Sequence, residues 1–251
     1  MTRLAVLALL VPAAALANPK PLPSTYGYAT TPAGDMEIEQ YVDLIPVRVT
    51  RELPTGDLEE ISTLRFDLQT EFEVGVTDRL ELAFYLAASQ PGADSPQLKL
   101  EGIKQRMRYR FAEAGQWPVD VGIYLEIAEL FDELELEQKI LLSRRFGKLM
   151  VAANLWIEQE YVYAEKEWEL AYHPTLGATY EVHPSVSVGL EYWMQGEFEG
   201  ETPVMYLGPT LLLQKGEYWL ATAAYVRLDD APSTGDPFGR FWLRFIVGIG
   251  L

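Results

Sequence analysis

A long stretch of strictly alternating residues constrains this chain more than any other feature. Between positions 64 and 76, seven apolar or Thr side chains alternate with mostly charged or polar ones; the seven are Leu64, Phe66, Leu68, Thr70, Phe72, Val74 and Val76. A period of two indicates a strand with one apolar and one polar face. The stretch is much longer than the about 5 or 6 residues of a typical globular strand, whereas a strand tilted across a bilayer needs about 9 to 11.

The same alternation recurs along the chain and divides it into about twelve expected strands. They cover residues 35–49, 60–76, 79–90, 97–112, 118–131, 133–146, 148–163, 167–181, 185–198, 203–214, 217–228 and 239–251. Tight connections alternate with longer polar ones, which is the hairpin asymmetry of outer-membrane barrels. An even number of strands closes the sheet, so that no unpaired edge faces lipid. The sequence therefore predicts an all-β fold, a transmembrane antiparallel up-and-down β-barrel.

Two positions interrupt the pattern. Leu98 and Leu100 share their parity with Lys104 and Arg106, so the alternation must change near Gly102. A β-bulge there would reconcile the two halves; the alternative is that the outer half of the strand projects beyond the lipid. Pro174 lies near the middle of the expected strand 167–181 and lacks the N–H that a ladder needs. It is the strongest argument against a continuous strand at that place.

The N-terminus precedes the alternating region and divides into two parts. Residues 1–17 contain one Arg, a short apolar stretch and a small-x-small end, which is the pattern of a secretory signal peptide. Residues 18–33 contain four Pro and are not expected to form a strand. We expect them to form a flexible periplasmic lead, with a plug folded into the barrel as the alternative. Residues 34–251 form the expected transmembrane barrel.

The composition excludes several classes of function. The chain has 37 acidic against 20 basic residues, a net charge of −17 and no Lys/Arg-rich stripe, which argues against binding to nucleic acid. With no Cys and two His, we expect neither a cofactor nor a metal site. His173 and His183 are the only histidines, and no GxSxG motif is present, so we do not expect an enzyme. An outer-membrane lipid hydrolase with a site assembled across strands is the remaining enzymatic alternative.

The inward faces of four neighbouring strands contain the candidate functional residues. The strand 97–112 presents four cations on alternate residues, and its neighbours present mainly acidic side chains. A basic ladder beside acidic walls sets a transverse field in a pore and selects by charge. The alternative is that the same pairs close the lumen as a cross-strand network. The expected pore-lining and selectivity residues are Lys104, Arg106, Arg108, Arg110, Asp67, Glu71, Glu73, Glu81, Asp120, Tyr124 and Glu126.

Acidic residues also gather in the expected long loops, where they could bind divalent cations or bridge to lipopolysaccharide phosphates. A solvated, repulsive rim is the simpler interpretation. The residues assigned to this rim are Glu52, Asp57, Glu59, Glu60, Asp132, Glu133, Glu135, Glu197, Glu199, Glu201, Asp229, Asp230 and Asp236.

The last strand resembles the terminal strand of bacterial outer-membrane β-barrel proteins. Its apolar face consists of Phe241, Leu243, Phe245, Val247, Ile249 and Leu251. That family usually closes with an aromatic residue, whereas this chain closes with Leu251. The resemblance implies recognition by the barrel-assembly machinery, export through the periplasm to the cell outer membrane, and contact with the lipid bilayer and lipopolysaccharide.

Residues 31–41 resemble the first strand of the uncharacterised phenol-degradation-pathway and transporter-like barrels. That resemblance implies passage of small molecules, including hydrophobic ones. Together with the barrel prediction, it favours a narrow channel or facilitator for small molecules with a charged lumen. The alternative function is a non-conducting barrel whose acidic extracellular loops bind a partner, divalent cations or lipopolysaccharide.

Overall fold

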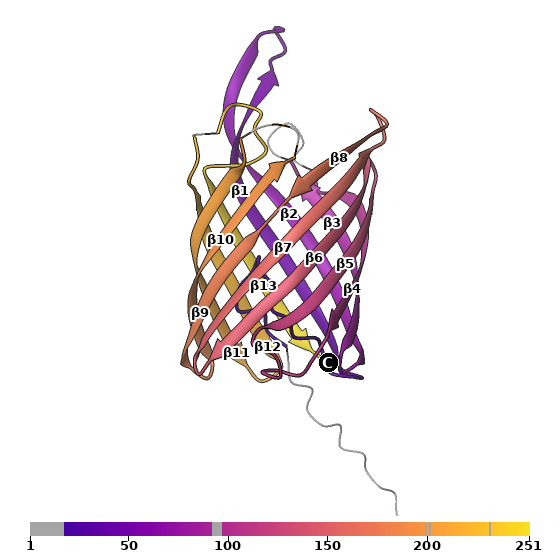
Figure 1. Cartoon of the computed structure of the whole chain (residues 1–251). Coiled ribbons are helices and arrows are strands. Elements are labelled where there is room, and N and C mark those ends of the chain that lie inside the picture. The colour runs from indigo at the N-terminus through magenta and orange to yellow at the C-terminus, as the bar shows by residue number, and fades with distance from the viewer. Residues whose placement is uncertain (1–17, 92–96, 199, 201, 231) are drawn as a thin grey trace, which may run out of the picture.

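The computed structural model is a closed antiparallel β-barrel (Figure 1). It describes residues 18–91, 97–198, 200, 202–230 and 232–251. The expected signal peptide, residues 1–17, lies outside the described residues, as do Glu199 and Glu201 of the expected acidic loops. No helix among the described residues is long and apolar enough to cross a membrane.

Apart from β8 and β9, consecutive strands of the chain pair with each other, and β1 also pairs with β13, which closes the sheet. The strands are β1 (Met36–Glu52), β2 (Leu58–Thr77), β3 (Leu80–Gln90), β4 (Lys99–Arg110), β5 (Asp120–Leu130), β6 (Glu133–Phe146), β7 (Leu149–Val162), β8 (Glu167–Tyr172), β9 (Thr175–His183), β10 (Val186–Glu197), β11 (Val204–Lys215), β12 (Tyr218–Arg227) and β13 (Phe241–Gly250).

The expected strand 167–181 is the one place where the strand assignment needs correction. It is interrupted at His173 and Pro174, so that β8 and β9 are separate strands. Both β8 and β9 pair with β7 on one side and β10 on the other, so together they fill a single position in the wall. The missing N–H and fixed φ of Pro174 explain the break. Twelve wall positions therefore contain thirteen strands.

The β-bulge expected near Gly102 is confirmed. Ala87 of β3 pairs with Gly102 and Ala88 pairs with Leu100, which leaves Glu101 as an extra residue on β4. Leu98 and Leu100 consequently point outward and are exposed. A Cβ atom at Gly102 would lie 2.1 Å from the backbone oxygen of Glu129, so only glycine fits this close approach.

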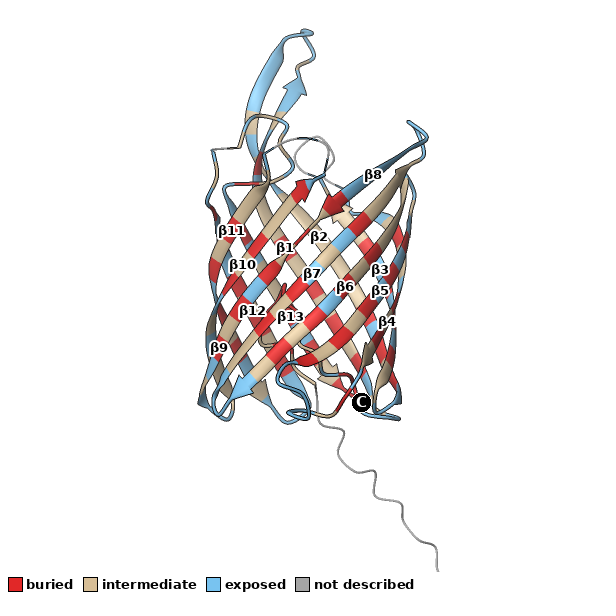
Figure 2. Cartoon of the chain, viewed as in Figure 1, coloured by how far each residue is buried: buried red, intermediate tan, exposed pale blue. Residues whose placement is uncertain are grey.

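Burial alternates along the strands (Figure 2). The sense is the inverse of that in a soluble protein, because large apolar side chains are exposed and charged ones are buried. On β3, for example, Leu82, Phe84 and Leu86 are exposed, whereas Glu81 and Tyr85 are buried inside the barrel. Exposed apolar side chains recur on other strands around the wall. A continuous apolar outer surface of this size is stable in lipid rather than in water. The predicted transmembrane β-barrel is confirmed.

The two rims of the barrel differ. At one rim the β1–β2 hairpin extends well beyond the wall (Figure 1), with Glu52 paired to Leu58 at its tip. At the other rim the connections are tight, such as Thr77 to Leu80 and Phe146 to Leu149. The C-terminus lies at this second rim (Figure 1), where the backbone N–H of Leu251 donates to the oxygen of Met36. By the usual asymmetry of outer-membrane barrels, the tight turns face the periplasm.

Candidate functional site

Arg106 is the centre of a buried ion-pair network inside β1 to β4. Its Nη1 lies 2.6 Å from Oε1 of Glu71, its Nη2 lies 2.7 Å from Oε2 of Glu73, and it also pairs with Glu81. Nη2 of Arg108 lies 2.6 Å from Oε2 of Glu81. Alternation on adjacent strands brings these side chains to the same interior face, since Arg108 is directly opposite Glu81 in the register.

Lys20 also belongs to this network, although it precedes β1 and is not part of a strand. Its Nζ lies 2.6 Å from Oε2 of Glu39 and 3.2 Å from Oε2 of Glu71, and it donates to the Tyr41 hydroxyl at 2.8 Å. The inward position of Glu39 follows from the alternation of the first strand, but no sequence signal placed Lys20 beside it. The buried network therefore contains the cations Lys20, Arg106 and Arg108 and the carboxylates Glu39, Glu71, Glu73 and Glu81.

The N-terminal segment, residues 18–35, enters the barrel: nearly all of residues 18–31 are buried or half-buried, whereas residues 32–34 are exposed. The backbone N–H of Ser24 donates to Glu191 of β10 at 3.0 Å, that of Tyr26 to Asn154 of β7 at 2.8 Å, and that of Thr31 to Glu81 of β3 at 2.8 Å. Because these acceptors lie on different sides of the wall, the segment crosses the lumen.

The N-terminal segment approaches the barrel wall most closely at two glycines. A Cβ atom on Gly177 of β9 would lie 2.7 Å from Cδ1 of Leu22, which is fully buried. A Cβ atom on Gly75 of β2 would lie 1.9 Å from the backbone oxygen of Pro32. The absence of side chains at Gly75 and Gly177 thus lets the segment approach the wall closely.

Two cavities lie on opposite sides of the segment. The cavity on the side of the long loops, which we call the outer cavity, has a volume of about 400 Å³. It is lined by Ser24 and Tyr26 of the segment and by Phe238 of the long loop between β12 and β13. The cavity on the side of the tight turns, which we call the inner cavity, has a volume of about 190 Å³. It is lined by Lys20 and Thr25 of the segment and by residues of the tight turns. The segment therefore separates the two halves of the lumen.

The outer cavity has an acidic side and an aromatic side. Aromatic side chains of β10 and β13 pack against Phe238, with ring centroids of Trp193 and Trp242 5.4 Å apart. The carboxylates of the lining come from β5, β6 and β7; they are Glu126, Glu135, Glu137, Glu158 and Glu160.

The predicted pore-lining residues that lie outside the buried network occupy other parts of the interior. Lys104 lines the outer cavity, with Nζ 3.5 Å from Oε1 of Glu126 and 3.2 Å from Oε2 of Glu135. Tyr124 also lines this cavity and donates to Glu126 at 2.5 Å. Asp67 pairs with Arg65 at 2.8 Å.

Two predicted residues lie towards the rim with the tight turns. Asp120 accepts a hydrogen bond from the backbone N–H of Gly115 at 2.7 Å. Arg110 lies 2.6 Å from Oε2 of Glu113, and its hydrogen bond lowers the pKa of that carboxyl below the usual value. The eleven predicted residues thus share the interior face but do not form one continuous ladder.

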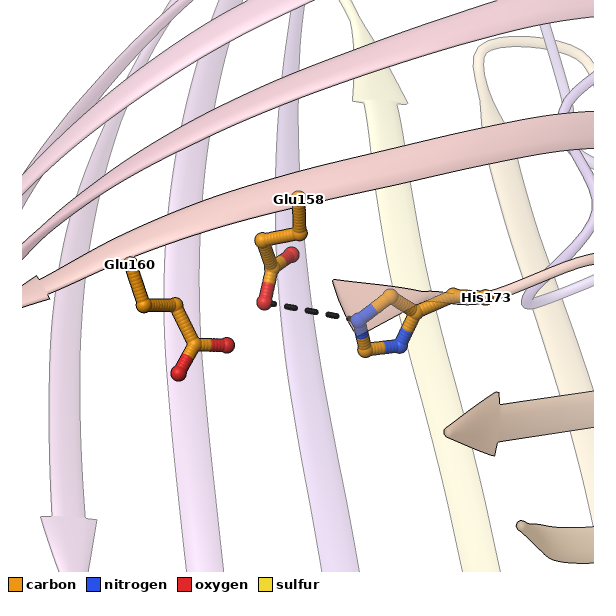
Figure 3. A group of neighbouring side chains, drawn as sticks. All are labelled: Glu158, Glu160 and His173. Carbon is orange, nitrogen blue, oxygen red and sulfur yellow. Dashed lines mark ion pairs between the residues drawn. The ribbon is translucent and has the colours of Figure 1, made fainter. Parts of the chain in front are cut away.

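Sequence reasoning missed the acidic wall on β6 and β7. Glu135 is directly opposite Glu160, and Glu137 is directly opposite Glu158. Glu135 was expected at the loop rim, but β6 begins at Glu133 and its alternate residues face the lumen. The signal was available, because both expected strands contain Glu at alternate positions. His173 lies beside this wall, and its Nε2 is 3.5 Å from Oε1 of Glu158 (Figure 3).

Three solved structures show the same type of fold. The outer membrane channel COG4313 from Pseudomonas putida F1 is 11% identical with a TM-score of 0.65, over 89% of this chain and 98% of that chain. The NanC porin is 7% identical with a TM-score of 0.55, over 85% and 98%. The translocator domain of the autotransporter NalP from Neisseria meningitidis is 10% identical with a TM-score of 0.51, over 87% and 88%.

At these identities the likeness establishes the fold, which is that of outer-membrane β-barrels, in agreement with the predicted location. No curated protein matches the chain. Residues 22–232 match the model of a family of unknown function, DUF6662. Since that match covers most of the sequence, the chain belongs to the family DUF6662.

Proposed function

We propose that this protein is a gated outer-membrane channel for small molecules. The observation that supports the proposal is the pair of cavities, about 400 Å³ and about 190 Å³, that lie on either side of the N-terminal segment within one closed barrel. A continuous wall with internal space on both sides of a removable barrier is the arrangement that a gated pathway needs. The similar structures include an outer membrane channel and a porin.

The N-terminal segment is attached in a way that suits a gate. In the part of the chain that the structure describes, residues 18–31 form no backbone-to-backbone hydrogen bond with the wall. They are held by side chains, including Glu39 through Lys20, Glu191 through Ser24 and Asn154 through Tyr26. These contacts can be exchanged for water without breaking the sheet, so the segment can move while the barrel stays closed.

The charges of the outer cavity favour the passage of cations. Its basic side chains are all paired with carboxylates: Lys104 with Glu135, Lys139 with Glu137, Arg65 with Asp67 and Arg244 with Asp43. Glu158 and Glu160 have no Lys or Arg within 4.0 Å among the described residues. An excess of carboxylates along a narrow path concentrates cations and repels anions.

Single-channel recording in planar bilayers tests the gate. We expect Lys20→Met to increase the time that the channel is open, because it removes the contacts of the segment with Glu39 and Glu71. Lys148→Met is the matched control, since it removes the same charge from the lining of the inner cavity without touching those carboxylates. Heat-modifiable migration on a gel shows that each variant is folded.

Two results would count against this proposal. Equal recordings from Lys20→Met and Lys148→Met would show that the segment does not gate the pathway. If neither the wild-type protein nor Lys20→Met shows channel current although both are folded and inserted, the protein does not conduct. That result would favour the non-conducting barrel with binding loops.

A further inference from the structure

Three side chains of the outer cavity form a group apart from the buried network. Glu158 and Glu160 lie two residues apart on β7 and therefore share its inward face. His173 follows the last residue of β8, and its backbone N–H donates to the oxygen of Trp156 at 3.0 Å, which fixes it beside the same strand. One ligand atom from each of the three side chains lies within 4.8 Å of the other two (Figure 3).

The imidazole of His173 is buried without a hydrogen-bond partner. The residue is 3% exposed, and neither ring nitrogen has a partner within the described residues. The ring stacks on Trp156, with centroids 4.4 Å apart and an interplanar angle of 25°, while Trp193 lies 6.1 Å away on centroids. Buried polar atoms normally have partners. Here stacking fixes the ring while Nε2 points at Glu158 (Figure 3).

The two carboxylates also lack a charge partner. Lys139 is the nearby cation, but its Nζ is 2.6 Å from Glu137 and lies 3.5 Å from the centroid of the Trp156 ring. Glu135 and Glu137 face the pair across the β6–β7 ladder, so the local charge is strongly negative. The other acidic group of the lumen, Glu39, Glu71 and Glu73, differs because Lys20 and Arg106 already neutralise it.

We propose that Glu158, Glu160 and His173 bind a divalent transition-metal ion such as Zn²⁺ on the wall of the outer cavity. One imidazole nitrogen and two carboxylate oxygens are a donor set that suits Zn²⁺, with bonds of about 2.0 to 2.2 Å. Donors of one tetrahedral ion lie about 3.4 Å apart at those bond lengths, so side-chain atoms that are within 4.8 Å of one another need to close by up to about 1.4 Å. Glu160 is only half-buried and can rotate to do so.

The bound ion would keep a coordination position towards the cavity, because the three ligands come from one side of the lumen. That position would be open to water or to a permeating molecule with a donor atom. The ion would also neutralise the part of the acidic wall that no Lys or Arg reaches. This site is independent of whether the barrel conducts.

Isothermal titration calorimetry with Zn²⁺ alone, on the refolded full chain after treatment with a chelator, tests the site. We expect about one equivalent to bind, and expect His173→Asn and Glu160→Gln each to weaken binding by on the order of 10-fold or more. Glu137→Gln is the matched control, because it removes a neighbouring charge from the opposite strand but no ligand. We expect it to have a much smaller effect. Glu160→Gln preserves shape and keeps the test usable if His173→Asn does not fold.

A second titration with Ca²⁺ separates the proposed site from a general acidic surface. We expect Ca²⁺ to bind far more weakly than Zn²⁺, because Ca²⁺ requires six to eight oxygen ligands, about twice what this site supplies. The proposal is overturned by an absence of Zn²⁺ binding, by equal weakening in Glu137→Gln and Glu160→Gln, or by Zn²⁺ binding that His173→Asn leaves unchanged.

Discussion

At the scale of the residue, side chains that share one face of one strand differ in how deeply they are buried. Lys104, Arg106, Arg108 and Arg110 all point into the barrel, yet Lys104 lines the outer cavity whereas Arg106 is fully buried. The loss of folding stability on removing a charged side chain depends on whether its former partners stay buried without a counter-charge. The residues of the β4 ladder should therefore respond very differently to the same substitution.

We expect Arg106→Met to destabilise the barrel by about 3 to 5 kcal/mol, because it leaves Glu71, Glu73 and Glu81 buried with too few cations. Arg110→Met is the control on the same strand face. It should cost much less, because its partner Glu113 lies in solvent at the rim. Denaturant unfolding of both variants in detergent measures the difference, and equal losses would contradict the assignment of Arg106 to the buried network.

At the scale of the element, the wall and the N-terminal segment are matched in shape. Most strand bounds agree with the alternation of the sequence within a few residues, as for residues 133–146, which are the predicted and the observed sixth strand. The contact of Leu22 with Gly177 joins a segment without regular structure to β9 across the lumen. A change confined to this contact should alter the segment and leave the sheet intact.

We expect Gly177→Ala to increase channel opening, because its Cβ would lie 2.7 Å from Cδ1 of the buried Leu22 and displace the segment. The double variant Gly177→Ala with Leu22→Ala should return towards the closed state, since it removes the clash. Single-channel open probability is the measurement. If the double variant opens as much as the single one, the steric explanation is wrong.

At the scale of the whole molecule, the charge distribution rather than any single site sets the field. The chain has a net charge of −17, and unpaired carboxylates line the outer cavity. Long-range fields of this kind steer ions and are screened by salt. Selectivity is therefore a property of the assembled barrel.

We expect the open channel to prefer cations, as read from the reversal potential in a KCl gradient with a chelator present. The preference should weaken as the salt concentration rises, because screening shortens the range of the field to about 10 Å at 0.1 M. Glu160→Lys should reduce it, whereas Glu165→Lys, on the exposed turn after β7, should change it little. Anion preference in the wild type would refute this assignment.

The amino-acid sequence by itself determined the wall of this protein, and the tertiary structure decided its interior. Alternation predicted the strands, their inward and outward faces and the bulge at Gly102, because each is a local consequence of a pleat that repeats every two residues. The contact of Lys20 with Glu39 and that of His173 with Glu158 join residues that no local pattern relates. Such contacts exist only once the closed sheet fixes which faces oppose each other across the lumen.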